Sequence, residues 1–223
     1  MRLERRGRWL ALGTAVLGFA CGGKGGGGTG PCTPSAATQL VKNGGDAQPW
    51  YFNNPLPAAL SVKALDASNC AVPGVVVNWA VASGGGGVTP AQGTTNANGI
   101  ASAADSLGSS AAQSVTATPA ITSLPTLTFS ATASAPPTTA AVDVKDNFFS
   151  PQGAVIKTGG TVTWTWGGAA AHNVTYSGGP TPRPADGPNQ TTGTFSSTIT
   201  AVGTYDYHCT NHGGMSGTIT VVH

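Results

Sequence analysis

Residues 205–215 constrain the fold of this chain more than any other segment. Residues 205–209 alternate aromatic or sulfur-bearing side chains with polar ones, in the order Tyr205-Asp206-Tyr207-His208-Cys209. A period of two is typical of a β-strand with one buried face. Gly213 and Gly214 follow and permit a tight loop, and residues 216–222 have the pattern of a returning strand. The segment therefore predicts β-structure in which the sulfur of Cys209 lies at the buried end of a strand.

The same segment carries three side chains that bind soft or borderline metals, in the spacing Cys-x-x-His-x-x-Met. They are Cys209, His212 and Met215, and His172 lies upstream in Ala-Ala-His-Asn-Val. Two imidazoles, a thiolate and a weak axial thioether form the ligand set of a blue-copper electron-transfer site. The pattern predicts one copper ion that alternates between Cu(I) and Cu(II). A zinc site or no metal site is the alternative, although zinc has little use for methionine.

Further motifs extend this pattern over residues 142–223. They are Asp146-Asn-Phe-Phe-Ser-Pro, Gly159-Gly-Thr-Val-Thr-Trp-Thr-Trp166 and His172-Asn-Val, together with the segment 205–215. With these motifs the C-terminal part resembles a plastocyanin/amicyanin-type cupredoxin. The resemblance implies a Greek-key β-sandwich that acts as a one-electron carrier and is not an enzyme.

The resemblance also implies a role for particular residues. The implied copper ligands are His172, Cys209, His212 and Met215. Asn173 and Thr210 are implied to hold the ligand loops together. Ala171 departs from the family pattern, because many members have proline before the first histidine.

His208 points away from Cys209 on the predicted strand. We expect it at the surface. A second electron route is the alternative, because the matching position in plastocyanins is a tyrosine with that role.

The N-terminus has the pattern of an export signal. Four arginines precede an apolar run at residues 9–20 that is too short to span a membrane. The run ends at Cys21 and resembles a bacterial lipoprotein signal, which implies acylation of this cysteine. We therefore expect a signal peptide at residues 1–20, a lipid anchor at Cys21 and a flexible Gly-rich tether at residues 21–31. The protein would be exported and anchored to a bacterial membrane, facing the periplasm or the cell exterior; ordinary secretory cleavage is the alternative.

Two cysteines, Cys32 and Cys70, have no role in the lipid anchor or the metal site. Export permits a disulfide, so we expect these two residues to be joined. Two free thiols are the alternative.

Residues 32–134 have the pattern of a separate β-sandwich. Short alternating runs begin near residues 60, 75, 99, 114 and 127, and the glycines at 84–87 separate two of them. The order of these runs resembles a bacterial Ig-like domain of the invasin/intimin type. We expect a spacer, with adhesion or partner docking as the alternative. A Pro-rich hinge is expected at residues 135–141 and a surface loop at residues 178–190.

Charge excludes one class of partner. Beyond residue 20 the chain has six basic and seven acidic side chains, so the formal charge of +2 belongs to the N-terminal arginines. No basic patch is present, and nucleic acid is therefore not an expected partner.

We expect a monomer that makes transient contacts with redox partner proteins and reaches the membrane through its lipid. Copper binding or buffering, and surface interaction through the Ig-like domain, stay open as alternative functions.

Overall fold

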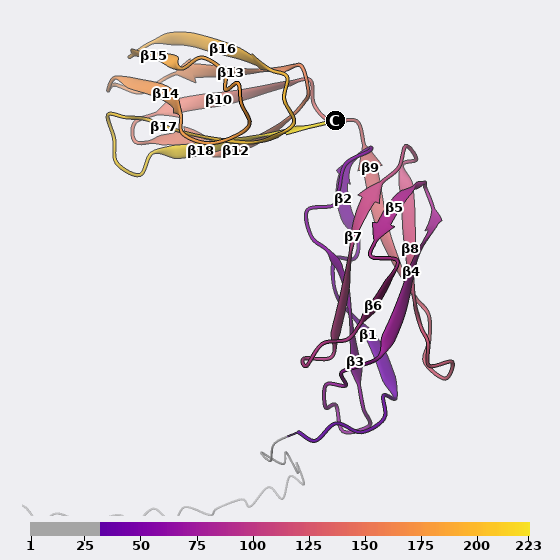
Figure 1. Cartoon of the computed structure of the whole chain (residues 1–223). Coiled ribbons are helices and arrows are strands. Elements are labelled where there is room, and N and C mark those ends of the chain that lie inside the picture. The colour runs from indigo at the N-terminus through magenta and orange to yellow at the C-terminus, as the bar shows by residue number, and fades with distance from the viewer. Residues whose placement is uncertain (1–31) are drawn as a thin grey trace, which may run out of the picture. The chain divides into compact units, whose positions relative to one another are not determined.

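The computed structural model describes residues 32–223, which form β-strands, turns and loops without a helix (Figure 1). The strands belong to four sheets, two built from residues 39–134 and two from residues 139–222. The all-β prediction is thus confirmed. The expected signal peptide, Cys21 and the tether lie outside the described residues. In the part of the chain that the structure describes, no helix has the length and apolarity needed to cross a membrane.

Two sheets form the N-terminal unit. The first has the order β1-β3-β7-β5, with β1 (Gln39–Gly44), β3 (Leu60–Leu65), β7 (Ile100–Leu107) and β5 (Gly86–Thr89). The second has the order β2-β9-β8-β4-β6, with β2 (Gln48–Tyr51), β9 (Leu127–Ser134), β8 (Ala112–Pro119), β4 (Val76–Ser83) and β6 (Gln92–Thr94). Alternate residues of β7, β8 and β9 are buried, as expected for strands with one face on a core.

The core of this unit is built around Trp79 and Phe129, whose ring centroids lie 5.8 Å apart. Whether the unit is Ig-like stays a prediction.

The glycine run differs from the sequence prediction, because β5 begins inside it at Gly86. Gly86 pairs with Leu107 of β7 and has a positive φ of 86°. A Cβ atom at this position would collide with the carbonyl oxygen of Ser106. The glycine therefore permits a close strand contact as well as a turn.

The predicted disulfide is confirmed. Cys32 and Cys70 are joined, with their Cα atoms 5.7 Å apart and a sequence separation of 38. Asp66 reinforces this corner, because its carboxylate accepts hydrogen bonds from the backbone N–H groups of Ser35 and Cys70, each at 2.9 Å. Closing a loop of this length stabilises the fold by roughly 3–4 kcal/mol in the chain-entropy account.

Two further sheets form the C-terminal unit, which carries the candidate site. The first has the order β11-β10-β13-β16, with β11 (Phe148–Ser150), β10 (Thr139–Lys145), β13 (Gly160–Trp166) and β16 (Gly193–Ile199). The second has the order β12-β18-β17-β14-β15, with β12 (Gly153–Lys157), β18 (Ser216–Val222), β17 (Gly203–His208), β14 (His172–Tyr176) and β15 (Gly187–Gln190).

An aromatic core joins these two sheets. Trp164 of β13 packs edge-on against Tyr207 of β17, with ring centroids 5.5 Å apart. Tyr205, Tyr207 and Cys209 are all buried, and Asp206 is exposed. The period of two therefore predicted the inward face of β17 correctly, and it places Cys209 at one end of the core.

Two segments contain strands that the sequence analysis did not predict. β10 begins at Thr139, so residues 139–141 of the expected hinge belong to a strand that pairs in parallel with β13. β15 lies inside the expected surface loop at residues 178–190 and pairs with β14. Both strands depend on partners distant in sequence, which a local pattern does not show.

Candidate metal centre

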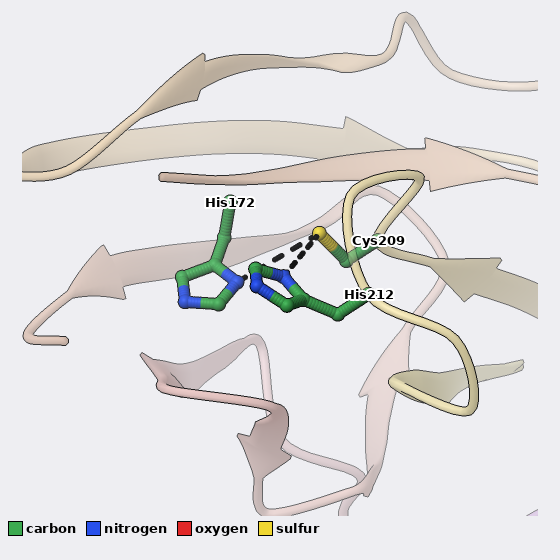
Figure 2. Close-up of side chains that lie close together, drawn as sticks. All are labelled: His172, Cys209 and His212. Carbon is green, nitrogen blue, oxygen red and sulfur yellow. Dashed lines mark hydrogen bonds between the residues drawn. The ribbon is translucent and has the colours of Figure 1, made fainter. Parts of the chain in front are cut away.

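Three potential metal ligands converge from two segments of the C-terminal unit (Figure 2). His172 is the first residue of β14, Cys209 follows β17 directly, and His212 lies in the loop before β18. The sulfur of Cys209 lies 3.8 Å from Nδ1 of His172 and 3.7 Å from Nδ1 of His212. The ligand atoms of the three residues all lie within 4.8 Å of one another.

This geometry suits a metal ion. Metal–nitrogen bonds of ~2.0 Å and metal–sulfur bonds of ~2.3 Å, 120° apart, separate nitrogen from sulfur by about 3.7 Å, close to both observed distances. Cys209 and His172 are buried, whereas His212 is half-buried. Cys209 is also the free cysteine among residues 32–223. The chain therefore supplies one thiol and two imidazoles at ligand spacing, with one imidazole near solvent.

Met215 closes the loop that carries Cys209 and His212. The N–H of Cys209 donates to the carbonyl of Met215 at 3.0 Å, and the N–H of Met215 donates to the carbonyl of His212 at 3.4 Å. Met215 is buried in the same apolar cluster as Cys209. The backbone thus holds the thioether residue in the same short loop as the thiol and the second imidazole.

The two ligand segments are joined by Asn173 and Thr210. Each residue follows a potential ligand in the chain, and together they form two hydrogen bonds, of 2.6 and 2.9 Å. The structure brings these two residues together as the family resemblance implied.

A second connection involves residues that the sequence analysis missed. Nδ2 of Asn211 donates to the carbonyl of Ala171 at 2.7 Å and to Oδ1 of Asn189 at 2.8 Å. Asn189 belongs to β15, so the segment expected to be an ordinary surface loop holds the ligand loop. The Asn-His pair at residues 211–212 gave no separate signal, because asparagine is common in loops.

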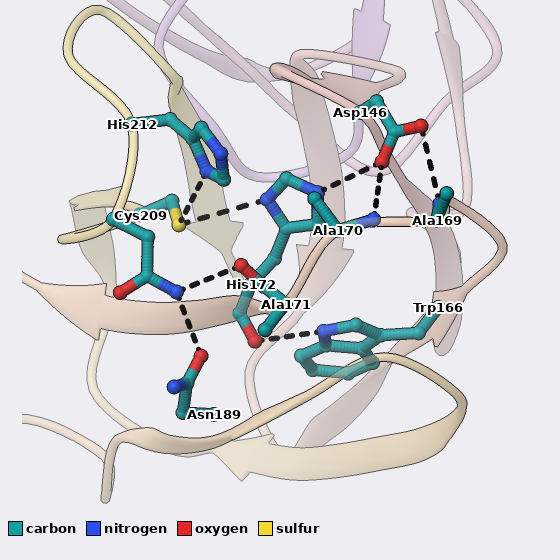
Figure 3. A network of polar contacts seen from close by, with 10 residues as sticks. Asp146, Trp166, Ala169, Ala170, Ala171, His172, Asn189, Cys209 and His212 are labelled. Carbon is teal, nitrogen blue, oxygen red and sulfur yellow. Dashed lines mark hydrogen bonds and ion pairs between the residues drawn. The ribbon is translucent and has the colours of Figure 1, made fainter.

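Asp146 provides a third connection at the site (Figure 3). Its Oδ1 atom accepts a hydrogen bond from the N–H of Ala170 at 2.9 Å, and Oδ2 accepts one from the N–H of Ala169 at 3.1 Å. Nε2 of His172 lies 3.3 Å from Oδ1. These hydrogen bonds, first those from the two backbone amides and then that from His172, lower the pKa of Asp146 to about 2. The carboxylate is therefore ionised at neutral pH.

Trp166 fixes the backbone of His172 from the core side. Its Nε1–H donates to the carbonyl of His172 at 2.9 Å, and both residues are buried (Figure 3). The sequence motif that ends in Trp166 therefore has a direct structural connection to the site.

His208 is not one of the three clustered ligands, although it contributes to the hollow beside Cys209 and His212. It is half-buried on β17 and lines a groove together with Asp206, Ser177 and Thr218. Its position agrees with the expected orientation away from the core.

Comparisons with known proteins agree with this geometry. Residues 138–222 match the family described as copper binding proteins, plastocyanin/azurin family. Amicyanin-alpha of Methylorubrum extorquens is 37% identical over 93 residues, which are 41% of this chain and 78% of that protein.

Solved structures are similar as well. A reduced amicyanin mutant has 36% identity and a TM-score of 0.34, covering 38% of this chain and 82% of its own. A purple cupredoxin from Nitrosopumilus maritimus has 26% identity and a TM-score of 0.34, covering 37% of this chain and 99% of its own.

Proposed function

Because this chain belongs, through its C-terminal unit, to the plastocyanin/azurin family of copper-binding proteins, we propose that it carries single electrons between redox partners outside the cytoplasm. His172, Cys209, His212 and Met215 are the residues that would hold the copper ion. Copper supplies the one-electron couple, and the protein supplies a fixed ligand set that suits both oxidation states. An enzymatic role is not part of the proposal.

One observation carries the proposal. The thiol of Cys209 lies 3.8 and 3.7 Å from the Nδ1 atoms of two histidines. The hydrogen bonds around Asn173, Asn211 and Asp146 hold both ligand segments in place. A ligand set that is held rigidly changes little when the charge of the ion changes, and this is what rapid electron transfer requires.

His212 is the proposed point of electron entry and exit. It is half-buried, whereas His172 is buried. Gly213 and Gly214 beside it are exposed and uncharged, and they line a hollow together with His212. Small neutral residues permit close approach of a partner, and electron-transfer contacts of this kind are typically small.

We further propose that Cys21 carries a lipid and that residues 21–31 tether the protein to a bacterial membrane. The basic and apolar segments before Cys21 support this part of the proposal. The unit at residues 32–134 would then act as a spacer between the membrane and the copper domain.

Spectroscopy and voltammetry of the mature protein test the central proposal. The Cu(II)-loaded protein should have the intense visible absorption and narrow EPR hyperfine splitting of a copper–thiolate site, and Cys209→Ser should lose both. Reversible voltammetry with fast electron exchange supports a carrier. Tight binding of copper without reversible electron exchange would instead indicate a buffer.

A further inference from the structure

We propose that Asp146 is a positioning residue for the copper site, and that its charge lowers the reduction potential of the bound ion. Its carboxylate would orient the imidazole of His172 and fix the loop that precedes this residue. The inference rests on the proposed ligand role of His172.

The carboxylate bridges two segments that are distant in sequence. Asp146 lies in the turn between β10 and β11, and the loop before β14 carries its partners. One oxygen accepts the N–H of Ala170 and lies 3.3 Å from Nε2 of His172, while the other accepts the N–H of Ala169. A single side chain thus fixes both a ligand ring and the backbone that leads to it (Figure 3).

The orientation of His172 determines which nitrogen faces the carboxylate. Nδ1 faces the sulfur of Cys209 at 3.8 Å, so this nitrogen is available to a metal ion. The proton of a neutral imidazole then lies on Nε2, which can donate it to Asp146. His172 is 0% exposed, so bulk water does not take the place of the carboxylate. Such a hydrogen bond fixes the ring and makes the ligating nitrogen more basic.

The loop itself is built of small residues. Residues 167–171 are all glycine or alanine. A Cβ atom on Gly168 would overlap the Oδ1 atom of Asp146. The loop therefore combines small residues that admit the carboxylate with backbone amides that bind it.

The charge of Asp146 should favour Cu(II), because the oxidised ion has one more positive charge to stabilise. The carboxylate is 47% exposed, so water reduces this effect. Loss of a residue that orients a metal ligand typically weakens binding by about 10–100-fold. A tenfold loss of affinity for Cu(II), with the affinity for Cu(I) unchanged, raises the one-electron reduction potential by about 59 mV.

Two substitutions and one control separate positioning from charge. Asp146→Asn keeps the size of the side chain, removes the charge and leaves one of the two oxygens that accept the backbone N–H groups, whereas Asp146→Ala removes both oxygens. Asp143→Asn is the control, because Asp143 is an exposed neighbour on β10 whose carboxylate lies 3.4 Å from Lys145. It also removes one negative charge.

We expect Asp146→Asn to raise the potential by tens of millivolts and Asp143→Asn to change it much less. In the copper-free protein, Asp146→Ala should increase amide hydrogen exchange at Ala169 and Ala170 at least tenfold. Equal shifts of the potential in the two Asn variants, or unchanged exchange in Asp146→Ala, would overturn the inference.

The wild-type protein separates this inference from the proposed function. If wild-type protein forms no redox-active copper–thiolate site, the proposed function fails and this inference with it. If the wild-type protein does form such a site, and both Asp146 variants have the same reduction potential and amide hydrogen exchange as the wild type, only the role of Asp146 is refuted.

Discussion

Asn173 and Thr210 form two hydrogen bonds in opposite directions across the two segments that carry the proposed copper ligands. Nδ2 of Asn173 donates to Oγ1 of Thr210 at 2.6 Å, and the N–H of Thr210 donates to Oδ1 of Asn173 at 2.9 Å. Because each residue follows a proposed ligand directly, this pair fixes the separation of His172 and Cys209.

Asn173→Ala should therefore weaken copper binding and destabilise the copper-free domain. Loss of two partly exposed hydrogen bonds costs about 1–2 kcal/mol, and Cu(II) affinity should fall by about tenfold. Chemical unfolding of the copper-free protein and competitive copper titration measure the two effects. Thr210→Ser keeps the hydroxyl group and should retain both properties; an equal loss in this control would contradict the assigned role of the hydrogen bonds.

Asn211 provides an independent test of loop rigidity. Asn211→Ala removes hydrogen bonds to both Ala171 and Asn189, so the ligand loop should become more mobile and Cu(II) EPR lines should broaden. Asn189→Ala removes only one of the two and should have a smaller effect on the EPR spectrum. Equal effects of the two variants would show that the contact with β15 is the important one, and a larger effect of Asn189→Ala would contradict the assigned role of Asn211.

The sequence predicted the potential metal ligands of the site better than the hydrogen bonds that hold them in place. Alternation in residues 205–209 placed Cys209 at the end of a buried strand face, and the spacing to His212 indicated one loop. These are local signals. Asp146 and Asn189 gave no comparable signal, because their partners lie 24 and 22 residues away and meet them only through strand pairing.

The same dependence on partners distant in sequence explains why β15 was not predicted. β15 has a glycine and a proline among its four residues, so its composition indicates a loop, and its pairing with β14 determines its structure. In contrast, the disulfide between Cys32 and Cys70 was correctly predicted, because a chain with the sequence pattern of an export signal leaves few other roles for two such cysteines.

Gly213→Asp tests the proposed docking surface without altering the site. A Cβ atom at Gly213 meets no other atom within 4 Å, whereas Gly214 has a φ of 83° that disfavours any side chain. Absorption at the copper–thiolate band should be unchanged. Electron exchange with a partner should slow severalfold, because a buried or poorly solvated carboxylate opposes docking.

The matched control is Ser109→Asp, which adds the same charge at an exposed turn of the N-terminal unit. If stopped-flow rates fall equally in both variants, overall charge causes the effect. If neither variant is slowed, partners dock elsewhere.

Asp105 permits a prediction of pH dependence in the N-terminal unit. This residue is on the inward face of β7 between Ala103 and Leu107 and is 5% exposed. Among residues 32–223, the structure records no hydrogen bond or ion pair to its carboxylate, and burial raises its pKa above the usual 3.8. A raised pKa in the folded state means that folding favours the protonated form. The stability that protonation contributes is fully present below the pKa of the unfolded state, and it is lost as pH rises through the pKa of the folded state.

Asp105→Asn should therefore stabilise this unit at pH 7 by at least about 1 kcal/mol, because it removes a buried charge without a partner. The advantage should shrink as pH falls and disappear near pH 3, where the wild-type carboxyl group is protonated in both states. Denaturant unfolding at pH 7, 5 and 3 measures the difference between the two proteins. A difference that does not change with pH would contradict the prediction, because it would mean that folding leaves the pKa of Asp105 unchanged and that the substitution acts through packing alone.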